Sequence, residues 1–275
     1  MTLTIGTGPF GPQSAGTFNF TREGPRHALY WEPSDRRVRV VFKGESIADS
    51  RSVMLLHETG HLSVYYFPLA DVRSDVLEPT DHSTHCPFKG DARYWSVRVG
   101  DRVAPDAVWN YEEPIDGCPP IAGHVAFYWN RMDQWYEEDE EVFVHPRDPY
   151  HRLDVVPSSR HVRICVDGEL IAESDRPMML FETGLPPRYY LPLDDVRDEV
   201  LVPSSSHTRC PYKGIASYWS VKTSEGVHDD LGWYYPEPIE EAGRIRGLVA
   251  FYNEHVDITC DGEELERPVT RFSKR

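Results

Sequence analysis

Short runs of alternating or continuous apolar residues, separated by turn residues, recur along the whole chain. The runs are rich in valine, isoleucine and aromatic residues, and glycine, proline, aspartate or serine lies between them. Runs of about four to eight such residues between turn signals are typical of β-strands. Strands this short at such regular spacing predict an all-β sandwich or a partly open barrel. In the first half of the chain the predicted strands are 38–42, 46–50, 53–58, 63–67, 93–99 and 124–129.

The second half of the chain repeats the first. Residues 38–133 align with residues 162–257 at a constant offset of 124 positions without a gap, and 46 of these 96 positions are identical. A repeat this long is domain-sized, since solenoid repeats are only about 20–50 residues long. We therefore predict a tandem duplication of one module, with the two modules packed about an approximate two-fold axis.

One segment in each copy has a helical pattern. Residues 69–77 follow Pro68, carry Asp71 near their start and place Val72 and Val76 on one side. A proline just before the segment and an acid in the first turn favour a helix start. The pattern predicts one short helix per module, barely two turns long.

Composition also sets the expected domain boundaries. The first 17 residues are rich in glycine, proline, serine and threonine, as in a flexible tail. The first module is expected at 18–136 and the second at 146–275. The acidic run EEDEE begins the segment 137–145, which we interpret as a solvated acidic linker.

The motif-like segment HPRDPYHR lies where the first module passes into the second. Its equivalent in the first copy keeps only two of the eight residues, Pro25 for Pro149 and His27 for His151. Because prolines stiffen a connection, we interpret the segment as a rigid connector between domains.

Overall composition limits the class of protein. An apolar fraction of 40% with 12% aromatic residues excludes a disordered chain. A formal net charge of −16 argues against a nucleic-acid partner, because lysine and arginine are needed to displace counterions. No stretch approaches the ~20 apolar residues of a membrane span, and the first residues lack the pattern of a signal peptide. We expect a cytoplasmic protein with neither a nucleic-acid nor a membrane partner.

The five cysteines indicate a reducing compartment, since their number is odd and their spacing forms no disulfide framework. Only Cys86 and Cys210 are equivalent between the copies, and Cys260 has no matched partner. No C-x-x-C is present, which excludes a four-cysteine zinc site.

The densest candidate for chemistry is the motif T-x-C-P-x-K-G, which begins at Thr84 and again at Thr208. A thiol is a nucleophile only as the thiolate, and a nearby lysine ammonium stabilises that form. Turn N–H groups could then hold an oxyanion. The alternative is a buried cysteine beside a rigid turn, with glycine needed for a positive φ. The residues of interest are Cys86, Lys89, Cys210 and Lys213.

Glu58 and Glu182 each end an apolar run, where a charge is disfavoured. A carboxylate that enters the core must be paired or neutral. The two readings are a structural ion pair, or a functional group that acts as an acid/base of raised pKa or orients the lysine. Candidate partners are Lys89 and Arg73 in the first copy, and Lys213 and Arg197 in the second.

Aromatic residues recur at the same positions in both copies. Adjacent aromatics on a strand point to opposite faces, so one of each pair is expected in the core while the other can line a pocket. With the threonine of the motif and the arginine partners, the candidate ligand-binding residues are Thr84, Tyr66, Tyr94, Trp95 and Arg73, and in the second copy Thr208, Tyr190, Tyr218, Trp219 and Arg197.

His82, His85 and Cys86 form the densest group of possible zinc ligands. The second copy replaces the two histidines by Ser206 and Arg209. We therefore expect no metal and no other cofactor.

The motifs of both copies resemble those of the domain of unknown function 427 family (DUF 427). The resemblance rests on G-E-x-x-A-x-S, E-T-x5-Y-Y-x-P-x-x-D-V, T-x-C-P-x-K-G-x-A-x-Y-W and the ending V-A-F-Y, and it covers nearly the whole chain. It implies a β-tent fold, similar in outline to the ligand-binding domain of cereblon and to methionine sulfoxide reductase B, without the zinc cysteines of many such domains. The family brings no established activity. It has also been labelled a nucleotidyltransferase, but the chain shows neither a phosphate-binding glycine loop nor a paired-aspartate metal motif.

We expect a protein that binds a small organic molecule of unknown class in one pocket per module. It is either an enzyme, a non-catalytic module that holds a ligand or a modified side chain, or a structural duplication with one degenerate copy. In the enzyme hypothesis the catalytic residues are the nucleophiles Cys86 and Cys210, their electrostatic partners Lys89 and Lys213, and the acid/base residues Glu58 and Glu182.

Overall fold

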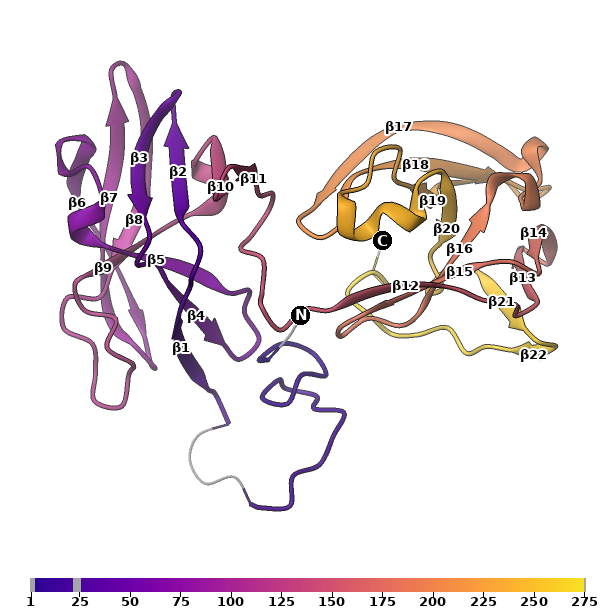
Figure 1. The fold of residues 1–275 in the computed structure, drawn as a ribbon, viewed down its shortest axis with the longest axis horizontal. Coiled ribbons are helices and arrows are strands. Elements are labelled where there is room, and N and C mark those ends of the chain that lie inside the picture. Colours follow the sequence, from indigo (N-terminus) through magenta and orange to yellow (C-terminus); the bar gives the residue numbers. More distant parts are fainter. Residues whose placement is uncertain (1–2, 22–25, 275) are drawn as a thin grey trace. The chain divides into compact units, whose positions relative to one another are not determined.

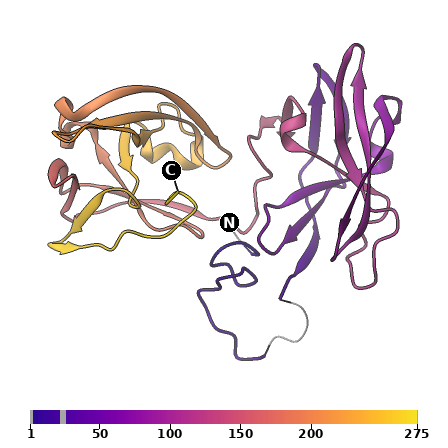
Figure 2. The ribbon, with the colours of Figure 1, turned by 180° about the vertical axis from the view of Figure 1, so that it is seen from behind.

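The computed structural model describes residues 3–21 and 26–274, and the chain folds as two compact units, Met1–Tyr150 and His151–Arg275. Strands and short turns make up each unit (Figure 1). Figure 2 shows the same strands from behind. No helix among the described residues is long and apolar enough to cross a membrane.

The described part of the first unit contains two antiparallel sheets. A seven-stranded sheet has the order β1-β4-β5-β9-β8-β7-β6, and a four-stranded sheet has the order β11-β10-β2-β3. The strands are β1 (Leu29–Pro33), β2 (Val38–Phe42), β3 (Glu45–Ser50), β4 (Met54–Glu58), β5 (Val64–Pro68), β6 (Leu77–Cys86), β7 (Gly90–Val99), β8 (Arg102–Asn110), β9 (His124–Phe127), β10 (Gln134–Glu137) and β11 (Glu140–Glu141).

The second unit has the same organisation over its described residues. Its seven-stranded sheet has the order β12-β15-β16-β20-β19-β18-β17, and its four-stranded sheet has the order β14-β13-β21-β22. The strands are β12 (Leu153–Pro157), β13 (Val162–Val166), β14 (Glu169–Ser174), β15 (Met178–Glu182), β16 (Arg188–Pro192), β17 (Leu201–Cys210), β18 (Gly214–Lys222), β19 (Val227–Tyr234), β20 (Leu248–Phe251), β21 (Asp257–Cys260) and β22 (Glu263–Glu264).

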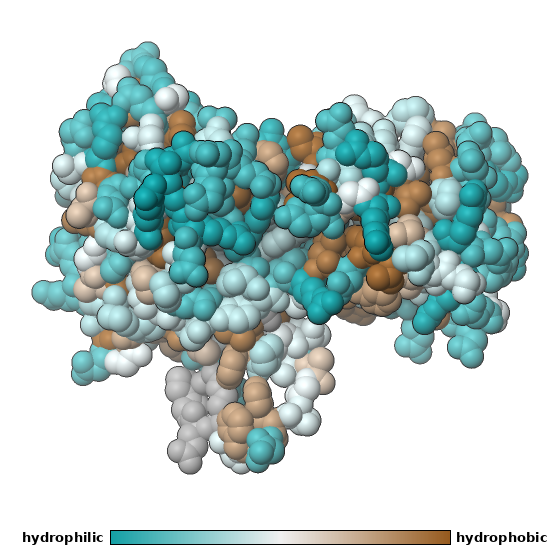
Figure 3. Space-filling view, in the orientation of Figure 1, coloured by the Kyte–Doolittle hydropathy of each residue, from teal (hydrophilic) through white to brown (hydrophobic). Residues whose placement is uncertain are grey.

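Equivalent strands occupy equivalent places in the two units, so the prediction of an all-β tandem duplication is confirmed. Among the described residues, neither seven-stranded sheet closes into a barrel, because each ends in two edge strands. Hydrophilic residues cover most of the face shown in Figure 3, with apolar residues between them.

The constant offset of 124 residues does not hold to the end of the repeat. Gln134 pairs with Val41, whereas Asp257 pairs with Cys165, which is the equivalent of Val41. Asp257 therefore corresponds to Gln134, and the offset falls to 123 in the last strands. The ungapped alignment was therefore wrong by one position at its end, where Asp133 had been matched with Asp257. Cys260, which had no match in the sequence, is the equivalent of Glu137.

The central strands of each seven-stranded sheet carry buried apolar side chains on both faces. In the first unit, Tyr65 and Phe67 lie in the main core cluster with the apolar side chains of the small sheet, such as Val40 and Phe42. Tyr66 points to the opposite face, where a second apolar cluster begins. This alternation follows from the two-residue period of a strand.

The helix expected after Pro68 is instead two 3₁₀ turns, η1 (Leu69–Asp71) and η2 (Ser74–Val76). Buried Val72 interrupts them, because it forms a β-bridge with Ala48. The second unit repeats this arrangement in η4 (Leu193–Asp195) and η5 (Asp198–Val200).

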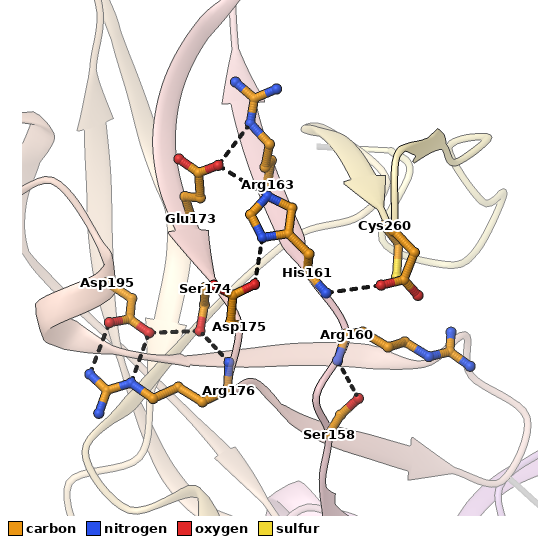
Figure 4. Close-up of polar contacts among 11 residues, drawn as sticks. Ser158, Arg160, His161, Arg163, Glu173, Ser174, Asp175, Arg176, Asp195 and Cys260 are labelled. Atoms are coloured by element: carbon orange, nitrogen blue, oxygen red, sulfur yellow. Dashed lines mark hydrogen bonds and ion pairs between the residues drawn. The ribbon is translucent and has the colours of Figure 1, made fainter.

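A serine–aspartate hydrogen bond holds the first of these turns against the neighbouring strand. In the second unit, Ser174 Oγ donates to Asp195 Oδ2 at 2.6 Å, and Arg176 Nη2 donates to Asp195 Oδ1 at 2.9 Å (Figure 4). In the first unit Ser50 donates to Asp71 in the same way. The last serine of G-E-x-x-A-x-S and the aspartate of the D-V pair are thus explained by one structural contact.

The acidic segment that we interpreted as a linker begins with a hairpin. Glu137 of β10 pairs with Glu140 of β11 at the edge of the small sheet. Glu137 is buried, and its carboxylate accepts hydrogen bonds from Arg36 and from the Tyr65 hydroxyl, the latter at 2.5 Å. These partners compensate the burial of its charge.

Glycine is required where the β17–β18 turn ends. Gly214 has φ +99°, and an added Cβ would lie 3.2 Å from the carbonyl oxygen of Glu237. We expect Gly214→Ala to lower the free energy of unfolding by about 1–3 kcal/mol, measured by urea denaturation. Gly243→Ala is the control, because no heavy atom lies within 4 Å of an added Cβ there. Equal losses in the two variants would contradict this account.

Candidate functional site

The T-x-C-P-x-K-G motif forms the hairpin turn between β6 and β7. Cys86 pairs with Gly90, and the Lys89 N–H donates to the Cys86 carbonyl at 3.2 Å. The Lys89 carbonyl accepts from the Ile115 N–H at 3.2 Å, and Lys213 makes the equivalent bond to Ile239 at 3.2 Å. The backbone of this lysine is therefore fixed on both sides.

The lysine of the motif forms an ion pair with the glutamate that ends the apolar strand. Lys89 Nζ donates to Glu58 Oε2, and Lys213 Nζ donates to Glu182 Oε2 at 2.5 Å. The lysine side chains are only 8% and 10% exposed. The structure therefore brings the glutamate and lysine candidates together in both units.

This ion pair crosses the face of the sheet. In the strand order, β5, β9 and β8 separate β4 from β7. Four steps of about 4.8 Å would span roughly 19 Å in a flat sheet, farther than the two side chains can reach together. The sheet must therefore curve, with the face of Tyr66 and Glu58 on its concave side.

A histidine that the sequence analysis missed completes the group. His27 Nε2 lies 2.8 Å from Glu58 Oε1, and His151 Nε2 lies 3.2 Å from Glu182 Oε1. His27 stacks on Phe88 at 3.8 Å between ring centroids, and His151 stacks on Tyr212 at 3.7 Å.

The signal for this histidine was present in the repeat. His151 was the one polar residue of HPRDPYHR that the other copy kept, but the segment was interpreted as a connector. We call the residues His27, Glu58 and Lys89, and their equivalents His151, Glu182 and Lys213, the His–Glu–Lys centres.

The glutamates of both centres are ionised at neutral pH. Burial alone would raise the pKa of Glu182, but the charge of Lys213 and the hydrogen bonds from His151 and Lys213 outweigh it and lower this pKa to about 2. The pKa of Glu58 is also lowered, because Lys89 and His27 outweigh its burial. Burial lowers the pKa of His151, which favours a neutral imidazole. These directions favour a carboxylate that orients its neighbours over an acid of raised pKa.

Aromatic side chains line the concave face beside each centre. Lys89 Nζ lies 5.9 Å from the ring centroid of Tyr111. The Thr84 and Tyr94 hydroxyls are 2.8 Å apart, and those of Thr208 and Tyr218 are 2.7 Å apart.

The hydroxyls of Tyr66, Tyr111 and Tyr190 remain protonated at neutral pH. Burial, together with the charges of Glu58 and of a Cys86 thiolate, raises the pKa of Tyr66 and of Tyr111. The same holds for Tyr190, where burial is again the largest cause.

Cys86 lies half-buried against the same aromatic cluster, beside Tyr94 and Tyr111. Among the described residues, no hydrogen bond joins its thiol to Lys89 or Glu58. In the second unit Cys210 is also half-buried. It lies near Tyr235, whose pKa is raised mainly by burial and further by Tyr190 and Cys210. The thiols are thus neighbours of the His–Glu–Lys centres without being bonded to them.

Four predicted ligand-binding residues lie elsewhere. Arg73 pairs with Glu45 and Asp75, and Arg197 pairs with Glu199, so the expected approach of these arginines to the glutamates was wrong. The reason is that each arginine lies at the surface, beside exposed acids that bind its guanidinium group. Trp95 and Trp219 pack against the main cores, on the opposite sheet face from Tyr94 and Tyr218.

The histidines next to the motif point to other partners. His85 lies 2.6 Å from Asp91 and is 66% exposed, while His82 packs against the Tyr94 ring at 4.4 Å between centroids. In the part of the chain that the structure describes, no three histidine, cysteine or acidic side chains are arranged to hold a metal ion.

Other buried titratable groups differ between the units. In the first unit, fully buried His57 contacts Glu32 at 2.8 Å, and its equivalent is Phe181. In the second unit, buried Arg188 forms two 2.7 Å bonds to Glu254. The His–Glu–Lys centre is present at equivalent positions in both.

Comparison with known proteins gives one family. The model described as "Domain of unknown function (DUF427)" matches residues 30–138 and again residues 154–262. No curated protein matches the chain.

The ion pair of the second unit makes a pH-dependent contribution to stability. The folded pKa of Glu182 is lowered from 4.5 to about 2, so the stabilisation is present above pH 4.5 and is lost as the pH falls toward 2. A shift of this size corresponds to about 3 kcal/mol. We expect Glu182→Gln to lower the free energy of unfolding by that order at pH 7 and by much less near pH 2, measured by urea denaturation.

Glu199→Gln is the matched control in the same unit, because Glu199 pairs with Arg197 but is 63% exposed. It should leave stability nearly unchanged at both pH values. A loss in Glu182→Gln that does not vary with pH would show that the ion pair is not its cause.

Proposed function

Because the chain belongs to the domain of unknown function family DUF427, with two tandem copies, we propose that each copy binds a small polar organic molecule at its His–Glu–Lys centre. The observation that supports this most is the presence of one centre, with the same three residue types and the same contacts, in both units. The two copies differ at about half of their aligned positions.

Stability alone is a weak reason to keep such a centre twice. A buried ion pair can be replaced by apolar residues of similar volume with little loss of stability. The copies do not share their other buried titratable groups, as His57 and Arg188 illustrate. A requirement for ligand binding accounts for the one group that both retain.

The chemistry of the centre suits a ligand with both donors and acceptors. A lysine ammonium has three N–H donors, of which the bond to the glutamate uses one. The ionised carboxylate accepts hydrogen bonds, and a tyrosine ring such as that of Tyr111 provides an apolar wall. The threonine–tyrosine pair, Thr84 and Tyr94, adds hydroxyls on the same face.

In the enzyme form of this proposal, the neighbouring Cys86 and Cys210 supply nucleophiles, with Lys89 and Lys213 as cations. The binding form is favoured because neither thiol is hydrogen-bonded to its lysine among the described residues. We also propose a cytoplasmic protein, because its cysteines form no disulfide framework. Its acidic composition argues against nucleic-acid partners, and its lack of a stretch of ~20 apolar residues argues against a membrane span.

A structural clasp is the second candidate. The centre joins three segments, namely the stretch before β1, the end of β4 and the β6–β7 turn. Its side chains are at most 19% exposed in the first unit.

Paired neutral substitutions separate ligand binding from stability. Glu58→Gln with Lys89→Met removes both charges of one centre, and Glu182→Gln with Lys213→Met removes those of the other. Removing both partners avoids a stranded charge, so we expect melting temperatures to fall by no more than about 4 °C. Binding of small polar compounds is measured by ligand-observed NMR. The wild type should have two sites, either paired substitution alone should leave one, and both together should leave none.

Glu78→Gln with Arg98→Met is the control, because this ion pair has a 2.6 Å contact but is exposed. It should keep both sites. The four-fold variant carries both paired substitutions. Compounds that bind it as tightly as they bind the wild type would contradict the proposal. A large fall in melting temperature without loss of binding would favour the clasp.

The enzyme form has its own test. If lysine activates the thiols, alkylation of Cys86 and Cys210 should be fast at neutral pH and should slow by about tenfold in the four-fold variant. The alkylation rates are measured by mass spectrometry of the modified peptides. Equal rates in the wild type and the variant would leave the non-catalytic binding form.

A further inference from the structure

The second unit contains a cavity on the side of its main core, away from the His–Glu–Lys centre. Its volume is about 240 Å³, and its lining includes Pro187, Tyr189, Asn253, Val256, Ile258 and Leu265. Tyr189, Val256 and Ile258 belong to the main core cluster. Tyr190, which belongs to the concave face, points to the other side of the same strand.

The first unit shows what fills the equivalent place. Ile258 corresponds to Trp135, because of the offset of 123 residues in the last strands. Asn253 corresponds to Trp129, since each directly follows a tyrosine with an equivalent backbone bond. The Tyr128 N–H donates to the Ala107 carbonyl, and the Tyr252 N–H donates to the Leu231 carbonyl.

Trp129 and Trp135 are stacked, with ring centroids 4.3 Å apart and planes 7° apart. Trp135 is buried in the main core of the first unit, and Trp129 packs against it. The second unit has lost both indole rings at these positions and keeps the tyrosine, Tyr65 or Tyr189, beside them.

The walls of the cavity are held open by other contacts. Asn253 Nδ2 donates to the Pro187 carbonyl at 3.0 Å, and Asn253 Oδ1 accepts from Arg188 Nη1 at 3.2 Å. Arg188 is itself bonded to buried Glu254. This network keeps the asparagine at the wall, so the space left by the indoles is not closed by its collapse.

We infer that the second unit binds a planar aromatic ring, the size of one indole, in this cavity. A cavity of ~150 Å³ lined by apolar side chains is enough to bind benzene. The cavity here is larger and opens to solvent, and its walls are mostly apolar, with Asn253 and Glu266 as polar lining residues. The ring of Tyr189 at its side favours stacking of a flat ligand. The site is specific to the second unit, and it does not depend on the function proposed for the His–Glu–Lys centres.

The test is a titration of the full chain with indole, followed by methyl NMR. The methyl signals of Ile258, Val256 and Leu265 should shift and saturate below about 1 mM indole. Methyl signals of Ile47, in the core of the first unit, should not move. Ile258→Trp restores the residue of the first copy, fills the cavity and should weaken indole binding at least about tenfold.

Leu265→Trp is a second filling variant, at the edge of the cavity, in case the first does not fold. Val227→Trp is the matched control, because Val227 is 56% exposed and does not line the cavity. It should bind indole as the wild type does, as should the variant without His–Glu–Lys charges. The inference is overturned if the wild type shows no saturable shifts, or if both filling variants bind indole as well as it does.

Discussion

One buried ion pair lies across the concave face of the large sheet in each unit. The lysine of a hairpin turn contacts the glutamate of a strand four steps away in the same sheet, Lys89 with Glu58 and Lys213 with Glu182. Such a contact is possible only across the concave side of a strongly curved sheet. The aromatic cluster of that side, the stacked histidine and the neighbouring thiol all occupy positions that this curvature creates.

The ion pair also accounts for the electrostatics of the concave face. Taking a carboxylate and an ammonium out of water is unfavourable unless each is paired and hydrogen-bonded. Here the glutamate accepts from both lysine and histidine, which keeps it ionised despite its burial. The result is a fixed arrangement of charge beside protonated tyrosines, in a site where ordinary packing would place apolar residues.

The duplication separates what is common to the fold from what belongs to one copy. Both units keep the strand order, the serine–aspartate contact of the 3₁₀ turns and the His–Glu–Lys centre. They differ in the buried network at the end of β4 or β16, and in the stacked indoles of the first unit, which the second lacks. The shared features therefore belong to the common fold, whereas the buried network and the stacked indoles belong to one unit each.

The sequence by itself determined the duplication, the assignment of adjacent residues to opposite faces, and the strands β2, β3, β4, β5, β7 and β9 of the first unit. It did not predict β1, β6, β8, β10 or β11. Strand periodicity is a local property, so the separation of Tyr94 from Trp95, or of Tyr65 from Tyr66, follows from their adjacency. Charge alone predicted a cation for Glu58 but did not choose between Lys89 and Arg73. Only the tertiary structure made that choice, because it depends on which strands become neighbours when the sheet curves. For the same reason it revealed His27 and replaced the expected helix by two turns around the bridge of Val72. It also exposed the one-residue shift that aligns Ile258 with Trp135. Contacts between residues far apart in the chain are set by strand order and curvature, and neither is encoded in the local pattern of apolar and polar positions.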